Sequence, residues 1–348
     1  DDNILNGTII LILITCIVAS FATEKASKKL LLEGGDADEL LKKPKIRSEQ
    51  ILILVANMAS LERLLDFSVL IKDKKSSNPV SILSVVTNNK EAEVNIVKAR
   101  ATLEDYIKQA SASETDVKVL TTIDQNPATG IARISREIMA DIIILGWPQR
   151  PRFLDKLFGE KVDSILNSTD KTTFICQLEK PLVVHKRIVV AVPPLAQRER
   201  GFVQWLLKIS QLAQELSVPL WLYANKATAE NATQTIEKSG TTIKPTIRQF
   251  EEWQDFLVLV KEVKPDDIFV VVSSRKGSPS FMSLMENLPV KIEKYFTTTT
   301  NIIVYPQSFE HDFSYEGYED MTAEPLNKGL AAVKQIGKGI GKIKSKVP

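Results

Sequence analysis

The sequence predicts an α/β protein with two tandem doubly wound parallel-sheet units, preceded by one transmembrane helix. Three observations support this fold class: an uncharged run covers residues 5–22, short apolar runs then alternate with stretches of helical periodicity, and that alternating pattern occurs twice along the chain. Short apolar runs are typical of strands that are buried on both faces of a parallel sheet. Their alternation with helices favours right-handed crossover connections.

The uncharged run at residues 5–22 is long enough to cross most of a bilayer. As a helix it would span roughly 27 Å at 1.5 Å per residue, compared with about 30 Å for a hydrocarbon core. Residues 6–8 weaken its apolar character, which leaves open a buried core helix. A secretory signal is the third alternative, although Asp1 and Asp2 stand where such a signal has basic residues. We predict a transmembrane helix with its flanks over residues 1–29.

The charges that flank the run predict its orientation. Acidic residues precede it and three lysines follow it, Lys25, Lys28 and Lys29. The positive-inside rule then places the downstream domains in the cytoplasm and the helix in the inner, cytoplasmic membrane.

A linker at residues 30–49, with a Gly pair, a proline and mixed charges, leads to the first α/β unit at residues 50–182. Five apolar runs in this unit have the length of strands: residues 51–60, 79–87, 116–123, 141–147 and 172–178. Amphipathic segments between them predict helices at residues 61–71, 90–112, 127–140 and 153–168.

The same pattern returns in a second unit at residues 186–307. Its predicted strands are residues 187–194, 218–225, 241–250, 266–274 and 297–306. Its predicted helices are residues 201–216, 253–263 and 280–296, the last of them interrupted by Pro289. The spacing supports a duplication, because 32 residues separate Asp141 from Thr173 and 32 separate Asp267 from Thr299.

The C-terminal region divides into an acidic linker at residues 308–324 and a basic amphipathic tail at residues 325–348. Apolar residues of the tail recur at helical spacing, and we expect its lysines to contact membrane lipid, Lys328, Lys334, Lys338 and Lys342 among them. Four glycines oppose a free-standing helix. Docking on acidic parts of the same protein and simple disorder are the alternatives.

Charge and composition exclude several function classes. The net charge is +2, and the tail alone carries six lysines, so the remainder is acidic and a nucleic-acid partner is not expected. The two cysteines, Cys16 and Cys176, fit a reducing compartment. The two histidines, His185 and His311, stand apart from any cysteine or metal-ligand spacing. We therefore expect neither a metal site nor catalytic residues, and no enzyme.

Each α/β unit resembles the universal stress protein domain in the order of its elements, and the first unit also resembles it in the glycine spacing after its fourth strand. The segment "DDNILNGTIILILITCIVASFATEKASKKL" resembles the last transmembrane helix of bacterial monovalent cation (Na⁺ or K⁺)/proton antiporters. Some of those antiporters carry tandem domains of this type as cytoplasmic extensions. The resemblance implies that the chain is part of a larger transporter.

Members of the stress protein family that bind ATP carry Gly, two residues, Gly, nine residues, Gly and then Ser or Thr after the fourth strand. Here Gly146 and Gly159 match the outer glycines, whereas Gln149 and Glu160 replace the middle glycine and the hydroxyl residue. Asn57 stands where the family has an acid at the end of the first strand. The resemblance thus implies a degenerate adenine-nucleotide site, and no cofactor is predicted outright.

Three interpretations of this loop remain open. The glycines serve only the turn and helix packing, or a modified ligand site forms around Asn57, Gly146, Arg150, Arg152 and Gly159, or ATP binds in the usual way. In the second unit the loop departs further, with Ser273, Lys276 and Glu286 at the glycine positions, Asn287 after them, and Pro193 at the acid position. Anion binding there would use Ser274, Arg275, Lys276 and Ser278, and the alternative is a solvated loop.

These observations predict the cytoplasmic regulatory region of a monovalent cation/proton antiporter, which controls ion exchange through conformational or ligand-dependent coupling. The expected partners are the transporter's own membrane domain, membrane lipid and a second copy in a homodimer. One alternative is a nucleotide-sensing protein anchored by a single helix. Another is a dimerisation module in which the apolar fifth strands, residues 172–178 and 299–306, pair at sheet edges.

Overall fold

The computed structural model describes Thr15, Ala19 and residues 48–308, except residues 56, 111–115, 148–154 and 252. Side chains are not described at 109–110, 155–161, 254–255 and 287. The predicted transmembrane segment lies outside the described residues, except for Thr15 and Ala19, which are helical. The basic tail at residues 325–348, with its lysines, also lies outside the described residues. Within the described residues, no helix combines the length and apolar composition needed to cross a membrane.

Residues 48–178, called the first half below, contain a five-stranded parallel arrangement in the order β3-β2-β1-β4-β5. Its strands are β1 (Ile51–Leu54), β2 (Val80–Thr87), β3 (Val117–Asp124), β4 (Ile142–Gly146) and β5 (Thr172–Gln177). Its helices are α3 (Leu61–Ile71), α4 (Ala92–Ala110), α5 (Pro127–Glu137) and α6 (Asp155–Ser168), with the short 3-10 helix η1 (Met58–Ser60) before α3. The strands and α-helices were predicted at similar positions, but β1 ends at Leu54, well before the end of the predicted run at residue 60, and η1 was not predicted.

Residues 185–308, the second half, repeat this topology in the order β10-β9-β6-β7-β8. The strands are β6 (Arg187–Ala191), β7 (Leu220–Ala224), β8 (Thr246–Gln249), β9 (Asp267–Val272) and β10 (Thr300–Tyr305). The helices are α7 (Phe202–Leu216), α8 (Lys226–Lys238) and α9 (Leu288–Tyr295), with 3-10 helices η3 (Ala196–Arg198), η4 (Trp253–Lys261) and η5 (Ser283–Asn287). The shared strand order supports the duplication that the 32-residue spacing indicates.

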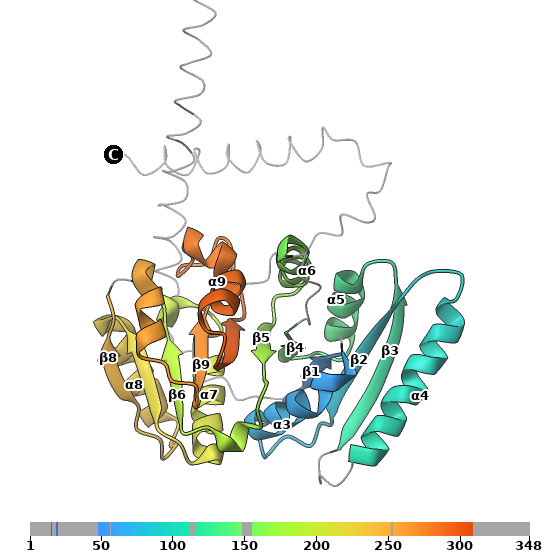
Figure 1. The fold of residues 1–348 in the computed structure, drawn as a ribbon, viewed down its shortest axis with the longest axis horizontal. Coiled ribbons are helices and arrows are strands. Elements are labelled where there is room, and N and C mark those ends of the chain that lie inside the picture. Colours follow the sequence, from blue (N-terminus) through green and yellow to red (C-terminus); the bar gives the residue numbers. More distant parts are fainter. Residues whose placement is uncertain are drawn as a thin grey trace, which may run out of the picture. The chain divides into compact units, whose positions relative to one another are not determined.

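The two halves form one continuous sheet, because their fifth strands pair with each other (Figure 1). β5 and β10 are antiparallel, with Asn301 opposite Gln177 and Tyr305 opposite Thr173. The prediction that these strands offer free edges to another molecule is therefore wrong, because each edge is covered by the other within the chain. Backbone groups at a strand edge pair with any available strand, and here the duplicate is available on the same chain.

Two hydrophobic layers cover the two faces of the sheet. On one face, α3, α4, α7 and α8 contribute buried side chains to a single cluster that includes Phe67, Leu103, Trp205 and Ile236. On the other face, α5, α6, η4 and α9 contribute to a second cluster that includes Ile131, Leu166, Trp253 and Ile292. Helices on both faces of a mostly parallel sheet make the doubly wound architecture that the sequence predicts.

Helix α8 was not predicted because little in its sequence is strongly apolar. Its buried side is made of small and hydroxyl-bearing side chains with one isoleucine: Thr228, Ala229, Ala232, Thr235 and Ile236. Asn225 caps its N-terminus, with Oδ1 accepting a hydrogen bond from the Thr228 N–H at 3.0 Å. Its burial rests on close approach to α7 and β7, which hydrophobic periodicity does not report.

Two further segments of the second half differ in detail from the prediction. The expected helix at residues 253–263 is the 3-10 helix η4. The helix expected at residues 280–296 is divided into η5 and α9. Pro289 is the second residue of α9, where the missing N–H has no helical partner to lose.

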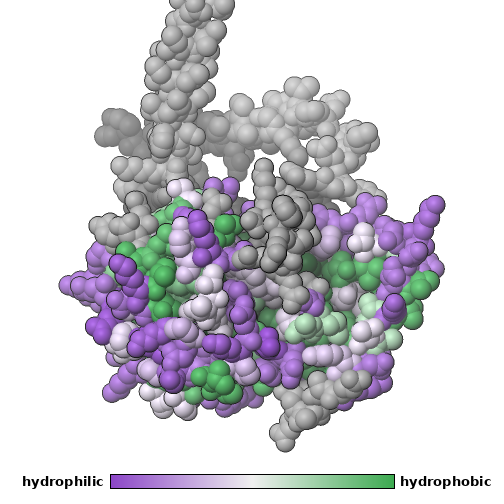
Figure 2. All heavy atoms as spheres, in the orientation of Figure 1, coloured by the Kyte–Doolittle hydropathy of each residue, from purple (hydrophilic) through white to green (hydrophobic). Residues whose placement is uncertain are grey.

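Hydrophilic residues cover much of the face drawn in Figure 2, with smaller hydrophobic areas between them.

Candidate functional site

In the first half, two of the predicted site residues lie at the carboxyl ends of neighbouring strands. Gly146 is the last residue of β4, and Asn57 follows β1, which pairs with β4 in parallel. Between β1 and β4 the strand order reverses direction, and open α/β sheets bind ligands at such a switch point. The structure therefore brings Asn57 and Gly146 to the edge where a ligand of this fold is expected.

The side chain of Asn57 already has a structural task. Its Oδ1 accepts a hydrogen bond from the Ala59 N–H at 3.0 Å and so caps η1. Its backbone carbonyl accepts from the Ser60 hydroxyl at 3.0 Å. The amide group of Asn57 thus holds the turn that leads from β1 into α3.

Gly146 lies where a larger residue would contact that same turn. A Cβ at this position would be 3.0 Å from Ser60 Oγ and 3.2 Å from Leu64 Cδ1. This close approach supports the interpretation that the glycine serves helix packing. Gly159 lies inside α6, whereas Arg150 and Arg152 lie outside the described residues.

The second half has a different arrangement at the equivalent edge, where β6 and β9 are neighbours. The loop that follows β9, residues 273–280 and called the β9 loop below, surrounds the carboxylate of Glu199. Glu199 Oε1 accepts hydrogen bonds from the Ser280 N–H at 3.0 Å, the Ser280 hydroxyl at 2.6 Å and the Ser274 hydroxyl at 3.2 Å. Glu199 is 5% exposed and belongs to the connection between β6 and α7.

Two effects act on the ionisation of Glu199. Burial raises its pKa, and hydrogen bonds from Ser280, Ser274 and Ser278 oppose that increase. Donors that converge on one oxygen favour the charged form of a carboxylate, which can only accept. The pKa of Glu199 is raised on balance, so the serines of the β9 loop surround a carboxyl group of the chain itself, and anion binding by Ser274 and Ser278 stays a prediction.

The other two residues predicted to bind an anion point elsewhere. Lys276 pairs with Glu286 at 2.9 Å on the surface. Arg275 donates to the backbone carbonyls of Thr169 at 2.9 Å and Lys171 at 2.7 Å in the first half. Burial lowers the pKa of the Arg275 guanidinium to about 10, so it remains protonated at neutral pH. Arg275 is thus a contact between the halves.

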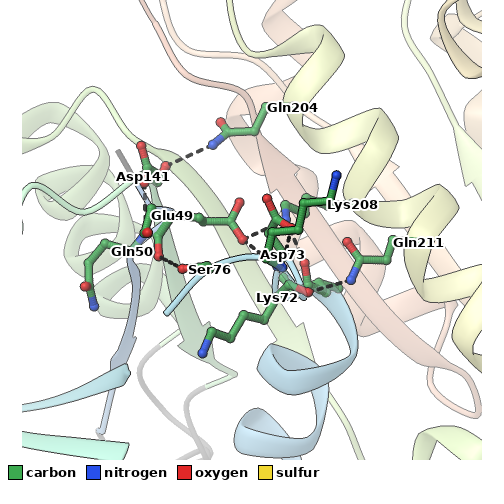
Figure 3. Close-up of polar contacts among 12 residues, drawn as sticks. Glu49, Gln50, Lys72, Asp73, Ser76, Asp141, Gln204, Lys208 and Gln211 are labelled. Atoms are coloured by element: carbon green, nitrogen blue, oxygen red, sulfur yellow. Dashed lines mark hydrogen bonds and ion pairs between the residues drawn. The ribbon is translucent and has the colours of Figure 1, made fainter. Parts of the chain in front are cut away.

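A second polar cluster joins the halves where the linker reaches the first half (Figure 3). Glu49 Oε2 lies 2.7 Å from Lys208 Nζ on α7 and accepts from the Asp73 N–H at 2.9 Å. Lys208 also donates to the Ile71 carbonyl at 2.8 Å. Gln211, one turn further along α7, donates to the carbonyls of Leu70 and Lys72.

Sequence reasoning missed Glu199, Glu49 and Lys208. Glu199 stands in the charged stretch "QRERG", Glu49 at the end of a mixed-charge linker, and Lys208 in an amphipathic helix. Each has the sequence neighbours of a solvated residue, and no signal in the sequence distinguishes it from a charged residue on the surface. Within the described part of the chain, no group of three or more His, Cys, Asp or Glu side chains is placed to hold a metal ion.

Comparison with known proteins places this geometry in context. Residues 49–177, nearly all of the first half, match the model of the universal stress protein family. The chain is 26% identical over 229 residues to the Na⁺/H⁺ antiporter NhaS5 of Synechocystis sp., and the match covers 61% of this chain. The chain spans about a third of that relative's length, because the match covers 33% of the antiporter.

The fold also occurs in a solved structure. A universal stress protein from Archaeoglobus fulgidus superimposes with a TM-score of 0.52 at 15% identity, covering 76% of this chain and all of the other. The cytoplasmic domain of a prokaryotic cation chloride cotransporter gives a TM-score of 0.49 at 14% identity, covering 76% and 97% of the two chains.

Proposed function

We propose that the two halves together are the cytoplasmic regulatory region of a monovalent cation/proton antiporter. The observation that carries the proposal is the sequence likeness to a Na⁺/H⁺ antiporter. The likeness covers 61% of this chain and about a third of the antiporter. The transmembrane helix predicted at residues 1–29 supports it, since that helix would connect the halves to a membrane domain. Regulation then means that the halves stabilise one transport conformation over another.

The contacts of Glu49 supply a route for this coupling. Glu49 is the residue at which the predicted linker ends, and it is 2% exposed in the cluster with Lys208 and Asp73. The C-terminal end of the linker is thereby held by both halves at once. A change in how the halves pack against each other would move the end of the linker, and a change in the linker would act on both halves.

The test begins with the size of the natural polypeptide. An antibody against the two halves should detect a species far larger than 38.8 kDa in native membranes. A species near 38.8 kDa would contradict the proposal, because the chain would then have no transporter attached.

The transport test compares the full polypeptide with a form that lacks residues 48–308, in inverted membrane vesicles loaded with a pH-sensitive dye. We expect the deletion to change the dependence of antiport on pH or on cation concentration. Lys208→Met should shift the same dependence, whereas Lys74→Met, which removes an exposed ion pair with Glu215 between the halves, should not. Unchanged transport in the deletion would overturn the proposed role.

A second candidate function is the sensing of an adenine nucleotide by the first half. The position of Asn57 and Gly146 at the β1–β4 switch point favours it, together with the family match of residues 49–177. Isothermal calorimetry with ATP and AMP at millimolar concentration tests it. Binding that is lost in Asn57→Ala and Arg152→Ala would support it, and the absence of heat would contradict it.

A further inference from the structure

We propose that the outer edge of β8 is a docking site for an extended acidic segment of another protein, which adds to the sheet as a further strand. β8 is the last strand of the second half in the sheet order, so one of its edges has no neighbouring strand among the described residues (Figure 1). This inference stands on the second half alone and is independent of any role in transport.

The outward-facing backbone groups of β8 are those of Ile247 and Gln249. The Phe250 N–H donates to a carbonyl of β7 at 3.0 Å, and the backbone groups of successive residues in a strand point to opposite sides. Those of Thr246 and Arg248 therefore point to β7, whereas those of Ile247 and Gln249 point away from the sheet. Their N–H donors and carbonyl acceptors are available to an incoming strand, which is how peptides add to open sheet edges.

Beside this edge, Arg248 is stacked on an aromatic ring. Its Cζ lies 4.6 Å from the centre of the Trp221 ring on β7, and the Cζ of Arg187 on β6 lies 4.4 Å from the same ring. Trp221 packs against the second hydrophobic cluster and so anchors the stack. A guanidinium held on an aromatic face keeps its planar N–H groups for a carboxylate, which it binds through two parallel hydrogen bonds.

The two arginines of the stack differ in how their charges are compensated. Arg187 donates to both carboxylate oxygens of Asp267, and its side chain is only 13% exposed. Arg248 is exposed, and no side-chain hydrogen bond or ion pair links it to another of the described residues. Arg187 thus holds the ring from the inner side, while Arg248 offers an uncompensated positive charge at the edge of the sheet.

The charge around β8 specifies the chemistry of the partner. From Lys238 to Phe250 the chain has three basic residues and no acidic residue, and both Lys244 and Arg248 are exposed. Like charges opposite each other on paired strands are destabilising, so this edge repels a second copy of itself. A strand with glutamate or aspartate at alternate positions would instead place carboxylates on the face of the sheet that carries Arg248.

The other end of the sheet provides an internal comparison. β3 is the edge strand there, and its exposed Lys118 stands in the sequence between Asp116 and Asp124, so the charge along β3 is mixed. Within the described residues, the arginines stacked on an aromatic ring both contact Trp221. The features that favour an acidic partner are therefore found at β8 and not at the equivalent strand of the first half.

The test measures the binding of fluorescein-labelled peptides to the full 348-residue chain in detergent solution by fluorescence anisotropy. The probe is a short peptide that alternates glutamate with threonine, because threonine favours an extended strand. A peptide that alternates lysine with threonine tests the sign of the charge. A peptide that alternates glutamate with proline keeps the acidic charge but cannot pair as a strand.

Two variants each remove one part of the site. Arg248→Ala deletes the guanidinium, and Gln249→Pro removes an outward N–H without removing a donor to β7. Lys118→Ala is the matched control, because it deletes an exposed basic side chain from the other edge strand. We expect the Glu–Thr peptide to bind the wild type and Lys118→Ala equally, and to bind Arg248→Ala and Gln249→Pro at least about tenfold more weakly.

The Tm of each variant is measured alongside, so that a loss of binding is not confused with unfolding. If Arg248→Ala does not fold, Arg248→Gln removes the charge and keeps more of the side chain over Trp221. Equal binding of the Glu–Pro and Glu–Thr peptides would show plain charge attraction and overturn strand addition. Stronger binding of the Lys–Thr peptide, no binding to the wild type, or an equal loss in Lys118→Ala and Arg248→Ala would also overturn the proposal.

Discussion

Lys208 Nζ lies 2.7 Å from Glu49 Oε2, and the two side chains form a buried ion pair between the halves. The Glu49 side chain is fully buried and that of Lys208 is 10% exposed. Both charges have further partners, the Asp73 N–H for Glu49 and the Ile71 carbonyl for Lys208. Because neither charge is left without hydrogen bonds, their removal from water is compensated.

Removing one member of this pair should destabilise the protein strongly. Lys208→Met leaves the Glu49 carboxylate buried without its cation, and we expect a loss of about 3–5 kcal/mol in the free energy of unfolding. The double variant Lys208→Met with Glu49→Gln should recover part of that loss, because no uncompensated charge remains. Urea unfolding measures both.

The control for that prediction is Lys74→Met, which breaks the exposed pair with Glu215. Exposed ion pairs contribute roughly 0–1 kcal/mol, so its midpoint should hardly move. Equal losses in Lys208→Met and Lys74→Met would show that the burial of the Glu49–Lys208 pair has no special role.

Arg275 should be irreplaceable by lysine. Its guanidinium bonds to the Thr169 and Lys171 carbonyls through two different nitrogens, a geometry that a single ammonium cannot reproduce. We expect Arg275→Lys to lower the free energy of unfolding by about 1–3 kcal/mol. Lys276→Arg is the adjacent control and should leave the urea midpoint unchanged. A stable Arg275→Lys variant would contradict a clamp between the halves.

Gly201 should not tolerate a side chain. An added Cβ would lie 2.2 Å from the backbone nitrogen of Gln307, and Gly201 N–H donates to the Gln307 carbonyl at 3.2 Å. Gly201→Ala must therefore displace backbone, and its Tm should fall well below that of Gly240→Ala. At Gly240 the φ of +75° disfavours alanine, but no atom lies within 4 Å of the added Cβ. A smaller loss at Gly201 than at Gly240 would contradict this packing.

His185 should make stability depend on pH below neutrality. Burial lowers its pKa, and its Nδ1 lies 3.1 Å from the Leu182 carbonyl while Nε2 lies 2.8 Å from the Thr300 hydroxyl. The unfolded chain therefore takes up a proton at a pH where the folded protein does not. The contribution of His185 to stability is complete above pH about 6.5 and decreases as the pH falls below it.

The measurement compares urea unfolding at pH 7.5 and 5.5. The wild type should lose more stability on acidification than His185→Gln, which does not titrate. Glu199, whose raised pKa acts in the opposite direction, is present in both proteins and cancels in the comparison. If the wild type and His185→Gln have the same pH dependence, His185 takes up its proton at the same pH in the folded and the unfolded states. That result would contradict the prediction.

Much of the fold was predictable because each half repeats a pattern that local sequence records. Residues 61–71 were predicted as a helix and are α3, and the runs that begin near Ile51, Ile142 and Thr172 are buried strands. Periodicity reports which side of an element is buried. Helix α8 was missed for the same reason, because alanine and threonine bury its face without an apolar signal.

The candidate site was only partly predictable. The glycine spacing led to Gly146, and the order of elements led to Asn57 at the adjacent strand end. That the Asn57 side chain caps η1 depends on backbone geometry, which the residue type alone does not specify. For the second half, residue types suggested anion binding at Ser274, but gave no sign that its hydroxyl bonds to Glu199, 75 residues away in the chain.

The sequence by itself determined that this protein contains two α/β units of the same design, because apolar runs and helical periodicity are local consequences of burial. Only the tertiary structure decided that β5 pairs with β10, that Glu49 meets Lys208, and that Glu199 fills the β9 loop. Each of these contacts joins residues far apart along the chain. A strand edge, a charge or a hydroxyl carries no mark of its partner, which folding selects by geometry and by the cost of leaving a buried polar group unpaired.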